Sequence, residues 1–251
     1  MCPKHRESVL REIRVRLESG QPCRLVSTQC VEAGVDLDFP VVYRAWGPLE
    51  AIIQAAGRCN RNGRVQSGSV RVFVPEREDG EQIRYPDGAY RQAADVLAQM
   101  YRHRGAEKLD PFLPEVIEEY YRTVFKLMGS AEESEVVNAI RERNFVEVNR
   151  KYRLIEGDTV NVLVPYDLDV WRALRDEVQA SFLSRSWMAR ARPYTVNLFR
   201  PRNDALVARY LDPVPVNWKQ KSEEWFVYIG EGHYNKDVGL APPENEVCWM
   251  V

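Results

Sequence analysis

The sequence predicts an α/β protein built from three segments: a unit with a parallel sheet in residues 1–78, a helical arm in residues 79–145, and a small α+β domain in residues 146–251. Short β-branched runs alternate with amphipathic helical segments as far as residue 75. The middle of the chain is acidic and carries apolar residues at helical spacing. Beyond residue 145, short alternating runs stand between Pro, Gly and Asn turns, which is typical of a compact α+β domain.

The first segment opens on an amphipathic helix over Arg6–Glu18, which Ser19–Pro22 stops. A short apolar run at Leu25–Val26 predicts a strand that ends where hydroxyl side chains begin. Two further strands are expected over Phe39–Ala45 and Gly68–Val74. Because helices alternate with these strands, we expect the sheet to be parallel.

The connections between these strands carry the polar residues of the segment. Thr28 is placed to cap a one-turn helix over Gln29–Ala33, which Gly34 ends in the left-handed conformation. A helix opened by a proline follows, and Arg58 and Arg61 lie three residues apart near its end, on the same side. Hydroxyls, a carboxylate and two guanidinium groups therefore meet at one edge of the sheet, where open α/β sheets bind ligands.

The remaining elements follow from periodicity after a charged, turn-rich loop at Pro75–Gly88. We expect helices over Tyr90–Arg104, Leu113–Met128, Ser134–Arg143 and Leu168–Phe182, and strands over Thr159–Val164, Val196–Phe199, Val207–Leu211 and Trp225–Gly230.

The composition bounds the class of protein. The chain has 251 residues, of which 45% are hydrophobic and 29% charged, so it is long enough for real cores. No apolar run approaches the roughly 20 residues of a membrane helix, and no signal peptide follows Met1, so a cytoplasmic protein without a membrane partner is expected. The five cysteines include no Cys-x-x-Cys pair and the three histidines are far apart, which argues for a reducing compartment and against a metal site.

Two signatures stand in fixed order between Arg24 and Arg64. The first is Ser27-Thr28 followed by Gly34-x-Asp36, and the second is Gln54-x-x-Gly57-Arg58-x-x-Arg61. They resemble motifs V and VI of superfamily-2 helicases of the DExH type. The wording from Ser27 to Phe39 resembles one family closely, the CRISPR-associated helicase–nuclease of type I systems. Met1 to Arg6 looks like the tail of its motif IV, and Gly230 to Leu240 is similar to a signature of its C-terminal domain.

The resemblance implies a second RecA-like helicase domain, present in part, and roles for single residues. It implies catalytic roles for Gln54, Arg58 and Arg61, nucleotide binding by Gly34, Asp36 and Gly57, and contacts to DNA from Ser27, Thr28, His5 and Arg6. In the family, the two arginines approach the γ-phosphate, and Asp36 contacts the ribose or the finger arginine. Each role has an alternative. Arg58 and Arg61 could be solvated arginines at a helix end, and Asp36 an ordinary turn residue. Thr28 could be a plain helix cap, and His5 and Arg6 part of a frayed N-terminus.

A second basic region spans Phe182–Arg202. It holds five arginines and no acidic residue, with aromatic residues interleaved. Such a pattern is what a channel for single-stranded nucleic acid uses, so Arg190, Arg192 and Arg200 are candidate DNA contacts. The alternative is that the rings belong to the core and the arginines are solvated.

Several family signatures are missing from the sequence. There is no Gly-Lys pair, hence no phosphate loop, and neither an Asp-Glu-x-His nor a His-Asp sequence. ATP and Mg²⁺ are therefore expected to bind mainly to the first RecA-like domain, and neither to this chain alone.

We expect the C-terminal part of an ATP-dependent helicase–nuclease of CRISPR interference, catalytically incomplete by itself. Its expected partners are single-stranded DNA, an RNA-guided surveillance complex, and the first RecA-like domain or the full helicase. The alternatives are a non-catalytic subunit that binds that complex or helicase, and a fragment of another superfamily-2 helicase.

Overall fold

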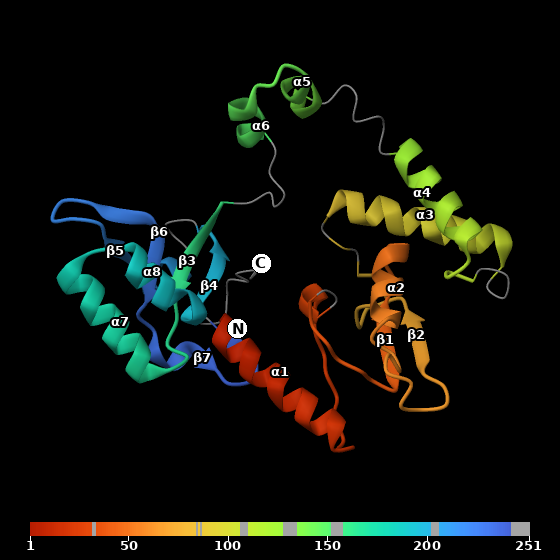
Figure 1. Cartoon of the computed structure of the whole chain (residues 1–251), viewed down its shortest axis with the longest axis horizontal. Coiled ribbons are helices and arrows are strands. Elements are labelled where there is room, and N and C mark those ends of the chain that lie inside the picture. Colours follow the sequence, from red (N-terminus) through yellow and green to blue (C-terminus); the bar gives the residue numbers. More distant parts are fainter. Residues whose placement is uncertain are drawn as a thin grey trace. The chain divides into compact units, whose positions relative to one another are not determined.

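The computed structural model divides the chain into two compact units (Figure 1). One unit joins Met1–Val15 to Arg153–Val251, and the other comprises Arg16–Tyr152. The residues that the structure describes are 1–31, 34–83, 85, 87–105, 110–127, 135–151, 158–201 and 206–241. The boundary between the two units lies within the first helix, whereas the sequence predicts a first segment of residues 1–78. The organisation into three segments stays a prediction.

The C-terminal unit is built on a four-stranded sheet in the order β4-β3-β6-β5. Its strands are β3 (Thr159–Leu163), β4 (Thr195–Phe199), β5 (Leu211–Pro215) and β6 (Lys221–Tyr228). The central pair β3–β6 is parallel, and both outer pairs are antiparallel. A small hairpin of β7 (Tyr234–Asn235) and β8 (Gly239–Leu240) follows.

Both faces of this sheet are buried, and the side chains along β3 alternate between the two cores. Val160 and Val162 lie in the core of one face, while Leu163 lies in the core of the other. Helices α7 (Leu168–Ser181) and α8 (Arg185–Ala191) cover the second face, where Trp171 and Trp187 are buried. A short 3₁₀ helix, η6 (Glu231–His233), leads into the hairpin.

Helix α1 (Pro3–Glu18) begins three residues before its predicted start and is anchored on the first face. The backbone N–H of Cys2 donates to Tyr234 Oη at 3.0 Å, and Cys2 is fully buried. A Cβ on Gly239 would lie 2.6 Å from the Met1 nitrogen, so only glycine lets the chain start approach this closely. The segment from Gly230 to Leu240, which resembles the C-terminal signature of the family, therefore packs against Met1 and Cys2.

The second unit contains a two-stranded parallel sheet of β1 (Val41–Ala45) and β2 (Ser69–Phe73). Helices α2 (Leu49–Ala56), α3 (Gly88–Arg104) and α4 (Pro114–Leu127) share one core, which includes Leu49, Leu97 and Tyr120. Asp87 caps α3 by accepting from the Tyr90 N–H at 2.9 Å. Helices α5 (Glu135–Arg141) and α6 (Phe145–Lys151) pack on each other.

The mixed α/β architecture with parallel strands confirms the predicted fold class, but two predicted strands are wrong. Residues 24–28 form no strand, because they do not pair with β1. Val26 in this segment is 99% exposed. Residues Leu206–Tyr210 form a 3₁₀ helix, η5, instead of a strand. Val207 and Tyr210 are three residues apart and both pack on one core, which suits the three-residue turn of a 3₁₀ helix.

Candidate functional site

The loop after α2 carries the second signature. The helix ends at Ala56, and Gly57 caps it in a right-handed conformation at an exposed position. Asn60 has a positive φ of 47°, and its side-chain amide bonds both the N–H and the C=O of Val65. A Cβ on Gly68 would lie 2.6 Å from Cys59 Sγ, so glycine is needed there for the chain to pass this loop. The loop is therefore closed by its own hydrogen bonds.

The first signature runs alongside this loop. The Phe39 N–H donates to the Arg58 carbonyl at 2.9 Å, and the Asn60 N–H donates to the Phe39 carbonyl at 2.8 Å. Phe39 and Cys59 thus form an isolated parallel bridge. Backbone pairing therefore brings the segment that follows the first signature alongside the second, although about twenty residues separate them. This pairing lies just before β1, at the amino end of that strand.

Asp36 and Arg61 form an ion pair at the edge of this arrangement. Arg61 Nη1 lies 3.0 Å from Asp36 Oδ1, with the arginine side chain 45% and the carboxylate 72% exposed. Gly34, just before, has φ of +72°, the left-handed conformation predicted for it. An exposed ion pair adds at most about 1 kcal/mol to the free energy of unfolding. The pair therefore orients the Arg61 guanidinium and contributes little to stability.

Asp38 is a site residue that the sequence did not single out. Its carboxylate accepts from the backbone N–H groups of Arg61 at 2.7 Å and Asn62 at 3.2 Å, and lies 3.7 Å from Arg64 Nε. The side chain is only 8% exposed. The available signal was the Asp-Leu-Asp alternation, because residues two apart in an extended segment point to the same side. Asp36 therefore holds the side chain of Arg61 while Asp38 holds its backbone.

A groove of about 1010 Å³ lies between the extended segment 23–28 and β1. Ser27, Thr28 and Arg58 all line it, so the structure brings these three predicted residues together. Tyr90 lines the groove as well and accepts a hydrogen bond from Arg44 Nη2 at 2.8 Å. Hydroxyls and guanidinium groups along one groove are donors for phosphate oxygens.

Two further predictions concern the ends of this site. Thr28 precedes a 3₁₀ helix at Gln29–Val31, which lies within the one-turn helix predicted over Gln29–Ala33. Residues 32 and 33 lie outside the described part of the chain. Gln54 is exposed on α2, one turn before the loop that carries Arg61.

His5, a predicted contact to DNA, lies in a buried position. His5 is 4% exposed, stacks on Tyr166 with ring centroids 4.8 Å apart, and has Nδ1 3.0 Å from Tyr234 Oη. Burial lowers the pKa of this imidazole, because the charged form loses its hydration. His5 is thus a core residue of the C-terminal unit, whereas Arg6 is exposed on α1.

The second basic region is divided among several structural roles. Trp187 is fully buried and donates from Nε1 to the Leu174 carbonyl at 2.8 Å. Arg190 forms two hydrogen bonds with the Glu177 carboxylate, which lowers the pKa of Glu177. Arg200 pairs with the Asp158 carboxylate. The alternative predicted for this region, rings in the core, holds for Trp187, and two of its three candidate arginines tie helices and strands together.

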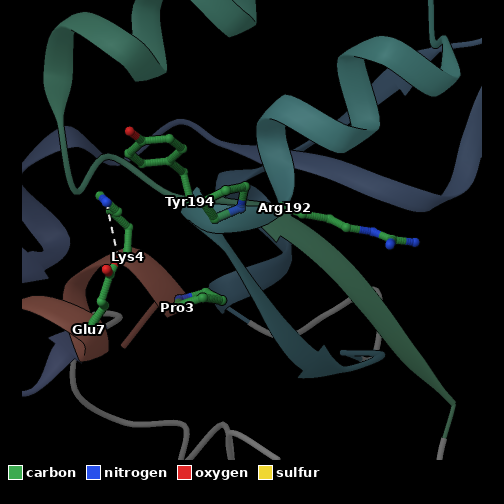
Figure 2. A pocket seen from close by; sticks show the side chains of 6 residues that line it. Pro3, Lys4, Glu7, Arg192 and Tyr194 are labelled. Atoms are coloured by element: carbon green, nitrogen blue, oxygen red, sulfur yellow. Dashed lines mark hydrogen bonds and ion pairs between the residues drawn. The ribbon is translucent and has the colours of Figure 1, made fainter. Parts of the chain in front are cut away.

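Arg192 lines a separate open pocket of about 440 Å³ with Pro3, Lys4, Glu7 and Tyr194 (Figure 2). Lys4 Nζ lies 3.0 Å from Glu7 Oε2 there. Figure 2 shows the Arg192 side chain pointing away from this ion pair. Of the three candidate arginines, Arg192 is the one that the described residues leave without a carboxylate partner.

Two kinds of feature are absent from the part of the chain that the structure describes. No group of three or more His, Cys, Asp or Glu side chains is arranged there to hold a metal ion. None of the helices within the described ranges has the length and apolar character needed to cross a membrane.

Comparisons with known proteins agree with the signatures. Residues 1–64 match the family described as CRISPR-associated nuclease/helicase Cas3, C-terminal. A CRISPR-associated nuclease/helicase Cas3 of Haloferax volcanii is 58% identical over 41 residues, which are 16% of this chain and 4% of that protein. The crystal structure of T. fusca Cas3-ATP is similar with a TM-score of 0.52 and 15% identity, covering 90% of this chain and 31% of that one. The T. fusca Cas3-AMPPNP structure gives a TM-score of 0.50 at 16% identity, with the same coverage. The structural likeness shows the fold, and the chain spans about a third of the Cas3 chains it matches.

Proposed function

Since this chain matches the C-terminal portion of the CRISPR-associated Cas3 helicase–nucleases, we propose that it supplies the arginine finger and part of the DNA path to an ATP-dependent translocase on single-stranded DNA. Arg61, with Arg58 and Gln54 beside it, faces the nucleotide phosphates. Asp36 and the backbone at Gly34 and Gly57 shape the nucleotide edge. Ser27 and Thr28 contact the DNA backbone.

The ion pair between Asp36 and Arg61 carries this proposal. A guanidinium group offers five N–H donors in a planar fork, so bonding Asp36 through Nη1 leaves other donors for a phosphate. Phosphoryl transfer spreads negative charge over the equatorial oxygens, and an arginine placed there contributes roughly 10³–10⁵ to the rate. Because Asp38 bonds the Arg61 N–H, the arginine is held before the nucleotide arrives.

ATP and Mg²⁺ would be held mainly by the first RecA-like domain, because this chain contains no phosphate loop and no Asp-Glu-x-His sequence. The T. fusca relative was crystallised with ATP and with AMPPNP, which supports nucleotide use by this kind of protein. The partners we propose are that first domain or the full helicase, single-stranded DNA, and the RNA-guided surveillance complex, with cytoplasmic action on invading DNA. The isolated chain should hydrolyse no ATP.

The test is the substitution Arg61→Ala in the protein that also carries the phosphate loop. ATP turnover with single-stranded DNA should fall by roughly 10³ or more while nucleotide affinity changes little, because a finger acts on the transition state. The matched control is Arg77→Ala, another exposed arginine paired with a carboxylate, Glu81, at 3.6 Å. Turnover of the Arg61 variant within a few-fold of the control would remove Arg61 from the finger role.

A further inference from the structure

The turn between β5 and β6 exposes a tryptophan. Trp218 is 89% exposed, whereas Trp171 and Trp187 in the same unit are 1% and 0% exposed. Figure 1 shows this blue hairpin turn at the outer edge of its unit. Tryptophan is highly buried on average, and displaying its indole to water forfeits the free energy of burial. A residue so placed is available to a ligand.

Hydrogen bonds fix the turn that carries Trp218. Asn217 Oδ1 accepts from the backbone N–H groups of Lys219 at 2.8 Å and Gln220 at 3.0 Å. Asn217 Nδ2 donates to Gln220 Oε1 at 2.9 Å, and the Val216 N–H donates to the Gln220 carbonyl at 2.9 Å. Because the backbone is already ordered, binding through this turn pays little further conformational entropy.

A second ring supports the indole. Phe182 packs edge-to-face on Trp218 with ring centroids 4.9 Å apart. Its φ is +64°, a conformation that a bulky residue rarely adopts. The next residue, Leu183, donates its N–H to the Pro215 carbonyl at 2.9 Å, which ties this segment to the hairpin. Backbone strain of this kind concentrates at functional sites, and here it presents an aromatic pair.

Charged residues of both signs lie near the pair, and those next to it in the sequence are basic. Lys219 follows Trp218 directly, and Arg185 follows Phe182 by three residues; both are exposed. Lys221 Nζ lies 3.4 Å from Asp212 Oδ1. Glu223 and Glu224 lie further along β6. Aromatic faces flanked by cations suit the successive bases and phosphates of a single strand. A protein partner would need a larger apolar surface, and the turn between β5 and β6 exposes little beyond these two rings and Val216.

We infer that Phe182 and Trp218 form a stacking platform for bases of single-stranded nucleic acid, with Lys219 and Arg185 contacting the flanking phosphates. The inference rests on the proposed function, since it takes single-stranded DNA as the ligand, and it gives the C-terminal unit a contact of its own. The platform uses Phe182 and Arg185 of the second basic region and none of the three candidate arginines, Arg190, Arg192 and Arg200.

The test is a titration of the full chain with oligo(dT), followed by tryptophan fluorescence and by anisotropy of the labelled oligonucleotide. Oligo(dT) should quench the exposed indole, and Trp218→Leu should remove this quenching and weaken binding roughly 5- to 150-fold. Lys219→Gln should lower the salt slope of log Kd by about one, and Lys236→Gln, an exposed lysine of the same unit, should leave affinity unchanged. Thermal melts establish that each variant is folded.

The outcomes separate the platform from the proposed function. Wild-type affinity in a folded Trp218→Leu variant overturns the platform and leaves the groove lined by Ser27 and Thr28 as the DNA path. Unchanged DNA affinity together with lost binding to the surveillance complex also overturns it and assigns the tip to a protein contact. No binding of oligo(dT) by the wild-type chain overturns the platform and the proposed DNA path together, while the finger role of Arg61 still stands on ATP turnover.

Discussion

The loop of Arg58–Arg64 and the stretch of Phe182–Arg200 are both rich in arginine, yet the structure uses their arginines differently. Arg61 pairs with Asp36 of another signature, and Arg190 pairs with Glu177 of the helix before it. Exposure does not separate them, since Arg61 is 45% and Arg190 54% exposed. The difference lies in the backbone: Asp38 fixes Arg61 in a loop beside a groove, whereas Trp187 fixes the helix of Arg190 in a core. An arginine–carboxylate pair alone therefore does not mark a site, and the element that positions the pair does.

The largest expected effect compares the two regions in one assay. In the protein that carries the phosphate loop, Arg58→Ala with Arg61→Ala should lower ATP turnover by roughly 10³ or more. Arg190→Ala with Arg200→Ala should leave turnover within a few-fold, because exposed pairs contribute at most about 1 kcal/mol to stability. Equal losses in the two double variants would break the distinction between the regions.

The aromatic residues of the basic stretch give the next effect. Trp187→Ala should destabilise the C-terminal unit by roughly 3–5 kcal/mol, because it empties a fully buried site and removes the indole hydrogen bond to the Leu174 carbonyl. Trp218→Ala is the matched control, since the same change at an 89% exposed position should cost little. Denaturant unfolding of both variants measures this, and a stable Trp187→Ala protein would mean that the stretch is not core.

A smaller effect is expected at Asp38. Asp38→Ala leaves the Arg61 and Asn62 N–H groups without their acceptor, which should loosen the loop by about 1–3 kcal/mol. Hydrogen exchange at these two amides should accelerate, and ATP turnover of the complete protein should fall with it. Asp79→Ala, which removes an acceptor from the Glu81 N–H in an exposed turn, is the control for a general loss of a turn aspartate. Unchanged exchange at Arg61 would show that Asp38 does not position it.

The smallest effect concerns pH and His5. Because burial lowers the folded pKa of His5 from 6.5, the unfolded chain binds more protons than the folded chain just below pH 6.5. Stability from this residue is complete above that pH and falls as the pH drops through the folded pKa. Thermal melts from about pH 7.5 to 5.5 should show this decline in the wild type and a weaker one in His5→Gln. A decline of equal size in both proteins would assign it to other groups.

The sequence predicted that the two signatures meet, but it placed them at the carboxyl ends of strands, one of which, at Leu25–Val26, the structure does not contain. Local rules account for the part that was predicted. A glycine in the left-handed conformation at Gly34 and a proline-initiated helix ending before Arg58 leave few arrangements for the residues between them. The roles of Asp38 and His5 could not be read in this way. His5 contacts Tyr234, 229 residues away, and such pairing depends on the assembled core. The strand expected at Leu25–Val26 was wrong for the same reason, since strand formation requires a paired neighbour as well as an apolar run.

The most direct test of the central claim is a double-mutant cycle on ATP turnover with Asp36→Ala and Arg61→Ala, in the protein that carries the phosphate loop. If Asp36 acts by orienting Arg61, Asp36→Ala should lower turnover in the wild-type background and have no further effect once Arg61 is alanine. The same fold-loss from Asp36→Ala in both backgrounds would contradict the account, because the carboxylate would then act independently of the arginine it contacts.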